Sequence, residues 1–181
     1  MRKMFILLPL LLALPSLAFF SVGARVGYFM PLGDYADTFS GGFTGGLKLD
    51  LGILPFLDTS LNVTYVEGTV VKDNPHGIPA MEMNSIVPVY LQAKLKLPGL
   101  IAPYVLAGLG LYFYSLEYTP VDAEEPVDET GAKFGYNAGL GLEISFLGFM
   151  GAYADGTYHW ADTEPATINS ITFQAGAYIG F

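Results

Sequence analysis

The chain has 181 residues, 52% of them hydrophobic, with a formal net charge of −9 and no cysteine. Such an acidic balance argues against nucleic acid as a partner, because nucleic-acid-binding surfaces concentrate lysine and arginine. Without cysteine there is no disulfide framework, and the length suits a single domain.

Residues 1–18 have the features of a secretory signal peptide. Two basic residues precede an apolar run over 4–14, and Ala18 ends a cleavage site of small residues. The run is too short to cross a bilayer as a helix, which takes about 20 apolar residues. We therefore predict a signal peptide at 1–18, removed by cleavage, and one domain at 19–181.

The rest of the chain alternates between apolar residues and polar or small ones. A period of two predicts β-strands with one apolar face, and each stretch is near the roughly 9–11 residues of a tilted transmembrane strand. The eight predicted strands cover 20–30, 43–53, 59–67, 84–97, 103–115, 133–146, 150–160 and 169–181. Pro88 predicts a bulge or a later start in the fourth strand, because proline lacks the N–H that a β-ladder uses.

The connections between these strands alternate in character. Short, nearly uncharged connections fall at 54–58, 98–102 and 147–149, and long polar ones fall at 31–42, 68–83, 116–132 and 161–168. Short turns at one end and long loops at the other are typical of outer-membrane barrels. Lipid satisfies no free backbone group, so strands that span a membrane must close into a barrel.

We therefore predict an all-β protein, an eight-stranded antiparallel up-and-down transmembrane β-barrel. A soluble barrel of the lipocalin kind is the alternative, and it would carry its apolar residues inside. In this sequence the ionised residues share one phase with the glycines, and the opposite phase is continuously apolar. A soluble barrel would have to bury the charged phase, so the membrane form is favoured.

Four segments carry a family resemblance. They are Gly27-Tyr28-Phe29-Met30-Pro31, 103–110, 134–141 and the terminal Phe181. Together they resemble the small eight-stranded outer-membrane barrels, the family of the OmpA transmembrane domain and OmpX, without the peptidoglycan-binding domain of full-length OmpA-type proteins. The resemblance implies a bacterial outer-membrane location, outer-membrane lipid and lipopolysaccharide as neighbours, and a monomeric state. It also implies that the barrel-assembly machinery reads Phe181.

Basic residues after the signal peptide concentrate on the inward phase, the set of alternate strand residues whose side chains would point into the barrel. All but Lys72 lie there, and counting along the strands puts three cations and three acids at similar heights near mid-membrane. These six residues are Arg25, Lys48, Asp50, Lys94, Glu143 and Asp155. The interior of an eight-stranded barrel is just wide enough for side chains, and unpaired charges there are costly. We predict that this lumen charge network closes the barrel with ion pairs, with a path for small ions as the alternative.

Glycines crowd the inward phase of the fifth and sixth predicted strands. They are Gly108, Gly110, Gly135, Gly139 and Gly141. We predict that large side chains pack against this wall, the candidates being Tyr90, Tyr104, Tyr112 and Tyr178. A small ligand cavity is the alternative.

Little in the sequence supports catalysis, cofactors or metals. Lipid-modifying outer-membrane enzymes need a histidine with a serine and an acidic partner. His159 shares a strand face with Asp155 and Thr157 but has no serine beside it, and His76 falls in a loop. We predict that His159 is a polar side chain at the barrel mouth, with no catalytic or cofactor site. No cluster has metal-ligand spacing, so we predict no metal site.

The long connections and the strand ends beside them are acidic. Their acids are Asp34, Asp37, Glu67, Asp73, Glu82, Glu117, Asp122, Glu124, Glu125, Asp128, Glu129, Asp162 and Glu164. We predict a solvated acidic rim, with cation bridging to lipopolysaccharide or contact with a basic partner as alternatives. The sequence thus favours a non-enzymatic barrel with a structural or surface-interaction role. A narrow channel comes second and a lipid-modifying enzyme third.

Overall fold

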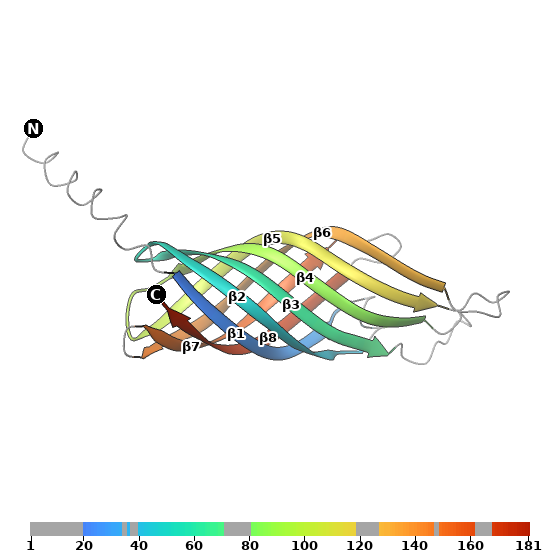
Figure 1. The fold of residues 1–181 in the computed structure, drawn as a ribbon, viewed down its shortest axis with the longest axis horizontal. Coiled ribbons are helices and arrows are strands. Elements are labelled where there is room, and N and C mark those ends of the chain that lie inside the picture. The colour runs from blue at the N-terminus through green and yellow to red at the C-terminus, as the bar shows by residue number, and fades with distance from the viewer. Residues whose placement is uncertain are drawn as a thin grey trace, which may run out of the picture.

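Eight strands form one closed antiparallel barrel in the computed structural model (Figure 1). They are β1 (Phe20–Pro31), β2 (Gly42–Leu54), β3 (Leu57–Val70), β4 (Met81–Lys96), β5 (Ile101–Tyr118), β6 (Val127–Phe146), β7 (Met150–Ala161) and β8 (Ile168–Gly180). Each strand pairs with the next, and β8 pairs with β1 to close the barrel. The predicted all-β up-and-down fold is confirmed.

The structure describes residues 20–33, 36, 40–70, 81–118, 127–146, 149–161 and 168–181. The predicted signal peptide lies outside these residues, as do 71–80, 119–126 and 162–167 of the predicted long loops. None of the described segments is a helix of the length and hydropathy needed to cross a membrane.

Side-chain alternation gives the barrel wall two chemically different faces. On β1 the outward Val26 is 68% exposed, whereas its neighbour Arg25 is 5% exposed. On β6 the outward Leu140 is 69% exposed, and Glu143 on the inward phase is 5% exposed. An apolar outer surface that surrounds a polar interior is stable against lipid rather than water.

The short turns and the C-terminus lie at one end of the barrel, which we call the inner end (Figure 1). Pro55 and Phe56 form the turn from β2 to β3. The backbone N–H of Phe181 donates to the carbonyl of Phe20 at 2.7 Å, and that of Gly180 donates to Phe149 at 2.6 Å. These bonds hold the last residues against the first strand and the β6–β7 turn. The opposite end is the outer end.

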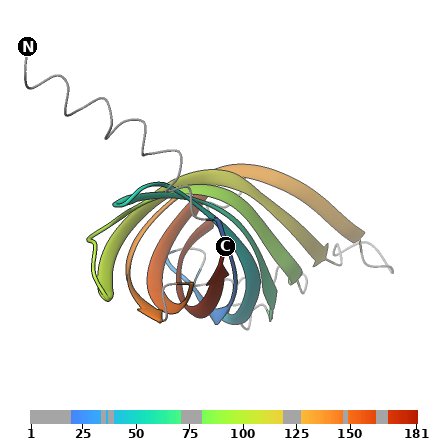
Figure 2. The same cartoon turned by 60° about the vertical axis from the view of Figure 1, so that its left-hand side comes forward.

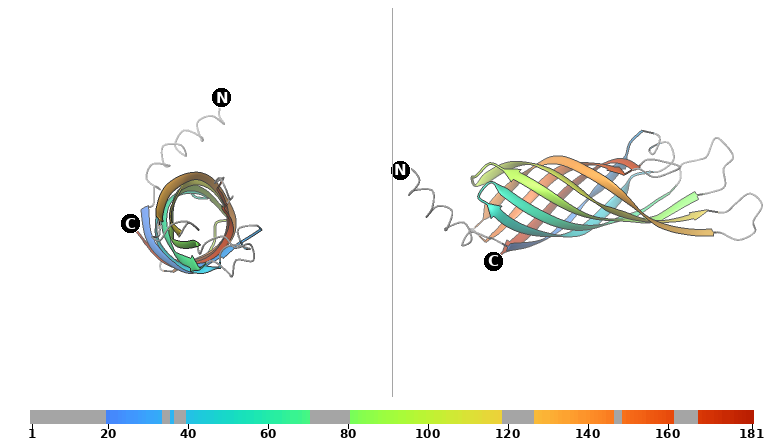
Figure 3. Two further views of the ribbon diagram at one scale, coloured as in Figure 1. Left: turned by 90° about the vertical axis from the view of Figure 1, so that its right-hand side faces the viewer. Right: turned by 90° about the horizontal axis from the view of Figure 1, so that it is seen from above.

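Strands β5 and β6 extend farther at the outer end than we predicted. They stay paired from Ile101↔Ile144 to Tyr118↔Val127. The loop predicted at 116–132 is therefore wrong over much of its length, because a continuous ladder occupies both of its flanks. Seen from two directions, β4, β5 and β6 project beyond the outer ends of β7 and β8 (Figures 2 and 3).

Two local predictions also need correction. Asp58 does not lie in the β2–β3 turn, because β3 begins at Leu57 and Asp58 faces the lumen at 4% exposure. Pro88 causes neither a later start nor a bulge against β3. β4 begins at Met81, and its register with β3 is the same on both sides of the proline. The irregularity in β4 lies instead between Met83 and Ser85, against β5.

Candidate functional site: the barrel lumen

Lys94 of β4 lies at the centre of the charged interior. Its Nζ is 2.9 Å from Glu143 Oε2, 3.0 Å from Asp58 Oδ2 and 3.8 Å from Asp50 Oδ2. The residue is 2% exposed. A buried ammonium group is costly unless it is paired and hydrogen-bonded, and here three carboxylates from three strands surround it.

Two further lysines complete what we call the ionic cluster, formed by Lys48, Asp50, Asp58, Lys94, Lys96 and Glu143. Lys48 Nζ is 3.1 Å from Asp50 Oδ2, and Lys96 Nζ is 2.9 Å from Asp58 Oδ2. Ser60 also donates to Asp50, and Tyr178 donates to Glu143 at 3.0 Å. The formal charges of these lysines and carboxylates balance, so the cluster ties β2, β3, β4 and β6 together without net charge.

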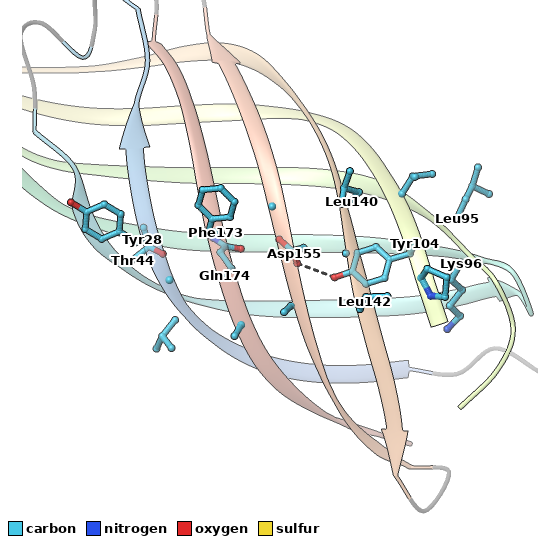
Figure 4. A pocket seen from close by; sticks show the side chains of 18 of the residues that line it. Tyr28, Thr44, Leu95, Lys96, Tyr104, Leu140, Leu142, Asp155, Phe173 and Gln174 are labelled. Atoms are coloured by element: carbon cyan, nitrogen blue, oxygen red, sulfur yellow. Dashed lines mark hydrogen bonds between the residues drawn. The ribbon is translucent and has the colours of Figure 1, made fainter. Parts of the chain in front are cut away.

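Arg25 and Asp155, which we predicted in the same network, lie outside the ionic cluster. Arg25 Nη2 donates to Thr64 Oγ1 at 2.5 Å and to Tyr90 OH at 2.7 Å. Asp155 accepts from Tyr104 OH at 3.0 Å (Figure 4) and from Thr157 Oγ1 at 3.2 Å. The backbone register explains the separation. Arg25 is paired with glycines on both neighbouring strands, and Asp155 lies between a glycine and a glutamine.

Asp58 and Lys96 belong to the cluster but were not among the predicted network residues. Asp58 shares the inward phase with Ser60 and Asn62, so extending the third predicted strand toward its turn would have found it. We predicted Lys96 on the inward face of its strand but outside the lumen charge network. Counting along separate strands cannot reveal that its long side chain reaches 2.9 Å from Asp58.

Tyrosines pack over glycines, as predicted. A Cβ built on Gly141 would lie 2.5 Å from Cζ of Tyr104, and one on Gly135 would lie 2.6 Å from Cε2 of Tyr112. Tyr153, which we did not predict, covers Gly176 in the same way, at 2.6 Å. Two of these rings also face cations. Lys48 Nζ is 4.3 Å from the ring centroid of Tyr153, and Lys94 Nζ is 5.4 Å from that of Tyr104.

Buried apolar side chains pack together in the lumen toward the outer end. This outer apolar cluster consists of Phe29, Val66, Ile86, Tyr112, Ala161 and Ile168, all between 0% and 3% exposed. We did not predict this cluster, because we expected the side chains that face the lumen to be polar or small. The position of these residues in the alternation of each strand could have revealed the cluster. Phe29 shares the phase of Arg25, and Val66 shares that of Thr64.

His159 is buried beside the outer apolar cluster rather than placed at an open mouth. It is 3% exposed, and its Nδ1 is hydrogen-bonded to Tyr112 OH at 2.8 Å. A serine does lie next to it across the sheet, since Ser170 of β8 is directly in register with His159. However, among the described residues neither His159 Nε2 nor Ser170 Oγ has a hydrogen-bond partner. The histidine therefore does not activate the serine in this arrangement.

Two pockets in the barrel differ in the chemistry of their lining. A cavity of about 250 Å³ enters the lumen at the inner end and is lined by polar groups, including Lys94, Lys96 and Glu143. A larger pocket of about 1490 Å³ is lined by outward apolar side chains such as Leu140 and Phe173 together with inward residues such as Asp155 (Figure 4). The described residues contain no group of three His, Cys, Asp or Glu side chains able to hold a metal ion.

Comparison with known proteins yields matches in fold but none in sequence. No protein-family model and no curated protein matches the chain. Neisserial surface protein A is 15% identical with a TM-score of 0.66, and the match covers 90% of this chain and 97% of that one. A major outer membrane protein from Thermus thermophilus is 14% identical with a TM-score of 0.64, covering 91% and 99%.

Ail, the attachment invasion locus protein of Yersinia pestis in complex with the heparin analogue sucrose octasulfate, is 14% identical. Its TM-score is 0.54, and the match covers 91% of this chain and 97% of that one. At these identities the likeness concerns the fold. With its closed eight-stranded barrel and apolar outer face, the protein has the fold of the small outer-membrane β-barrels.

Proposed function

We propose that this protein is a sealed outer-membrane barrel with a structural or surface-interaction role. The observation that carries the proposal is the burial of side chains at two levels of the lumen. The ionic cluster fills the interior around Lys94, which is 2% exposed, and the outer apolar cluster fills it around Ile86, which is also 2% exposed. A solute would have to break ion pairs and displace packed apolar side chains to pass.

A narrow channel is the second candidate, and one observation favours it. The polar cavity at the inner end reaches Lys94 and Glu143, so solvent enters part of the lumen. Transport would require this cavity to continue past the outer apolar cluster. The burial of Phe29, Val66 and Ile168 at 2–3% exposure argues against that continuation.

A lipid-modifying enzyme is the least supported candidate. Such chemistry needs a nucleophile and a base that the substrate can reach. His159 and Ser170 are 3% and 0% exposed, and Asp155 is engaged by Tyr104 and Thr157. A phospholipid or lipid A headgroup would have no access to these side chains.

The surface role draws support from two sources. Neisserial surface protein A and the attachment invasion locus protein Ail share the fold, and their names refer to a surface and to attachment. In this protein, strands β4, β5 and β6 project beyond β7 and β8 at the outer end (Figure 3). Ail was solved with a polyanion, a class of ligand that suits the acidic outer segments of this chain poorly.

The proposal is tested by a swelling assay on proteoliposomes that contain the refolded protein, with arabinose and glycine as solutes. We expect the swelling rate of empty liposomes. A general porin in the same lipid is the positive control. Swelling well above the empty-liposome rate would contradict the sealed barrel and favour the channel.

A further inference from the structure

The three turns at the inner end of the barrel (Figure 1) carry large apolar side chains at their tips. Phe56 of the β2–β3 turn is 50% exposed, Leu100 of the β4–β5 turn is 70% exposed, and Phe149 of the β6–β7 turn is 46% exposed. The segments around these tips contain no Asp, Glu, Lys, Arg or His, and they are 51–57, 97–106 and 144–154. Turns in water are usually rich in polar residues, so these exposed tips need an apolar partner.

The ionised side chains nearest to the inner end all point into the lumen. Asp58 and Glu143 are 4% and 5% exposed, and Lys96 is held between them as part of the ionic cluster. Among the described residues, no ionised side chain therefore lies on the outside of the barrel near the three turns. An ionised group on this surface would oppose contact with lipid, because charge on a lipid-facing wall is costly.

The backbone of each turn is hydrogen-bonded to a neighbouring strand. The carbonyl of Phe56 accepts from the N–H of Lys96 in β4 at 2.9 Å, and that of Leu100 accepts from Ser145 in β6 at 3.1 Å. The carbonyl of Phe149 accepts from β8 in the same way, at 2.6 Å. Lipid offers no partner to a free backbone group, so bonds of this kind are what a turn needs in order to enter it.

Exposed aromatic side chains differ between the two ends of the described barrel. Toward the outer end they include an outer girdle of residues with a polar group on the ring, formed by Tyr28, Tyr65, Tyr136, Tyr158 and Trp160. Toward the inner end they are all phenylalanines, namely Phe20, Phe56, Phe146, Phe149 and Phe181. Tyrosine and tryptophan suit the boundary between lipid and water, whereas phenylalanine has no polar group to place there.

The apolar surface also continues without interruption from the wall to the turns. On β4 the outward Leu95 and Leu97 are 51% and 65% exposed, and Leu100 follows at the tip. On the other side of the same turn, Ile101 and Val105 of β5 are 60% and 56% exposed. The occupant that covers the wall is therefore in contact with the turns as well.

We infer that the inner end of the barrel binds the lipid bilayer itself, with the tips of its three turns inserted among the acyl chains of the adjacent leaflet. The inference rests on the proposed outer-membrane function, for which it names phospholipid as the partner at this end. A soluble protein or a second copy fits less well, because either would have to displace lipid from a surface that is continuous with the wall.

The test uses the mature protein refolded into phosphatidylcholine nanodiscs, in which both ends of the barrel meet solvent. Trp160 is the single tryptophan of the chain, so the wild type reports on the outer girdle. Trp160→Phe combined with Phe56→Trp reports on the inner end. We expect this double variant to emit at a shorter wavelength than the wild type and to be quenched less by iodide. In nanodiscs of phosphatidylcholine with brominated acyl chains, it should lose most of its emission.

Two further variants complete the comparison. Trp160→Phe combined with Leu100→Trp repeats the measurement at a second turn, should the first variant not fold. Trp160→Phe combined with Leu91→Trp is the matched control, because Leu91 is 50% exposed on the wall of β4 and should be quenched by brominated lipid. Iodide quenching at the turns stronger than that of the wild type would place them in water and overturn the inference. Protection from both iodide and brominated lipid would also overturn it, in favour of a protein partner or a second copy.

These outcomes are distinct from failure of the proposed function. Leaky proteoliposomes would contradict the sealed barrel wherever the turns lie. A sealed barrel whose turns are open to iodide would contradict only the inference about the inner end.

Discussion

Lys94 is the residue on which the pairing of several buried charges in the lumen depends. It bridges carboxylates from β2, β3 and β6, so removing any one partner leaves charge buried without compensation. Breaking a buried pair in this way costs far more than breaking an exposed one. Asp155 is different, since its partners Tyr104 and Thr157 are neutral hydroxyl donors.

This contrast predicts an order of stabilities. Glu143→Ala should lower the free energy of unfolding by about 3–5 kcal/mol, because Lys94 loses its nearest carboxylate. Asp155→Ala should cost about 1–3 kcal/mol, the penalty for donors left unsatisfied. Glu124→Ala, in the segment that joins β5 to β6, should change it by about 0–1 kcal/mol. Urea unfolding of the refolded barrel followed by tryptophan fluorescence measures all three. Equal effects of Glu143→Ala and Glu124→Ala would contradict the role given to the ionic cluster.

Glycine positions offer a second test at the same scale. A methyl group on Gly141 would lie 2.5 Å from the ring of Tyr104 and 2.6 Å from the carbonyl of Ala154, whereas one on Gly45 meets nothing within 4 Å. Gly141→Ala should therefore destabilise the barrel by about 1–3 kcal/mol through overpacking. Gly45→Ala is the matched control and should be neutral or slightly stabilising. The same unfolding experiment compares them, and a loss at Gly45 as large as that at Gly141 would contradict the packing described.

The residues of the lumen were only partly predictable from sequence. Inward phase identified Lys48, Asp50, Lys94 and Glu143, because a period of two fixes the face of a strand residue. Phase alone did not show that Arg25 bonds to Tyr90 rather than to an acid. That choice depends on how strands three apart in the barrel are staggered, and the stagger follows from closure of the whole sheet.

At the scale of elements, the strands were predictable where lipid contact enforces alternation and less so beyond it. Predicted and observed bounds agree within one residue for β1, β2, β7 and β8. β5 and β6 continue past their predicted ends through residues that include Glu117, Asp128 and Gly131, whose types have low intrinsic strand propensity. Cross-strand pairing outweighs that propensity, because strand preference depends strongly on neighbours.

The last strand supports a prediction about assembly. Phe181 is 76% exposed and exchanges two backbone hydrogen bonds with Phe20, donating at 2.7 Å and accepting at 3.4 Å, so it adds little to the folded barrel itself. We expect that deleting Phe181 leaves refolding in detergent nearly intact, as judged by the heat-modifiable band on gels. In cells we expect the same deletion to reduce the outer-membrane band sharply, because the family resemblance implies that the assembly machinery reads Phe181. Normal assembly of the deletion variant in cells would contradict the signal assigned to Phe181.

At the scale of the whole molecule, the barrel combines an apolar exterior with an interior in two layers. Charges neutralise each other toward the inner end, and apolar side chains pack toward the outer end. The fold was predictable because alternation, loop asymmetry and the terminal aromatic residue agree with one another. The outer apolar layer was not predictable from charge patterns. Its members lie on separate strands, and they come into contact only because the sheet closes into a barrel.

Ion conductance across a planar bilayer tests the sealed lumen most directly. We predict that the refolded wild type gives no steady single-channel steps above the lipid background at either polarity. Steady steps in the wild type, with unfolding free energy unchanged by Glu143→Ala, would contradict the closure by ion pairs and apolar packing.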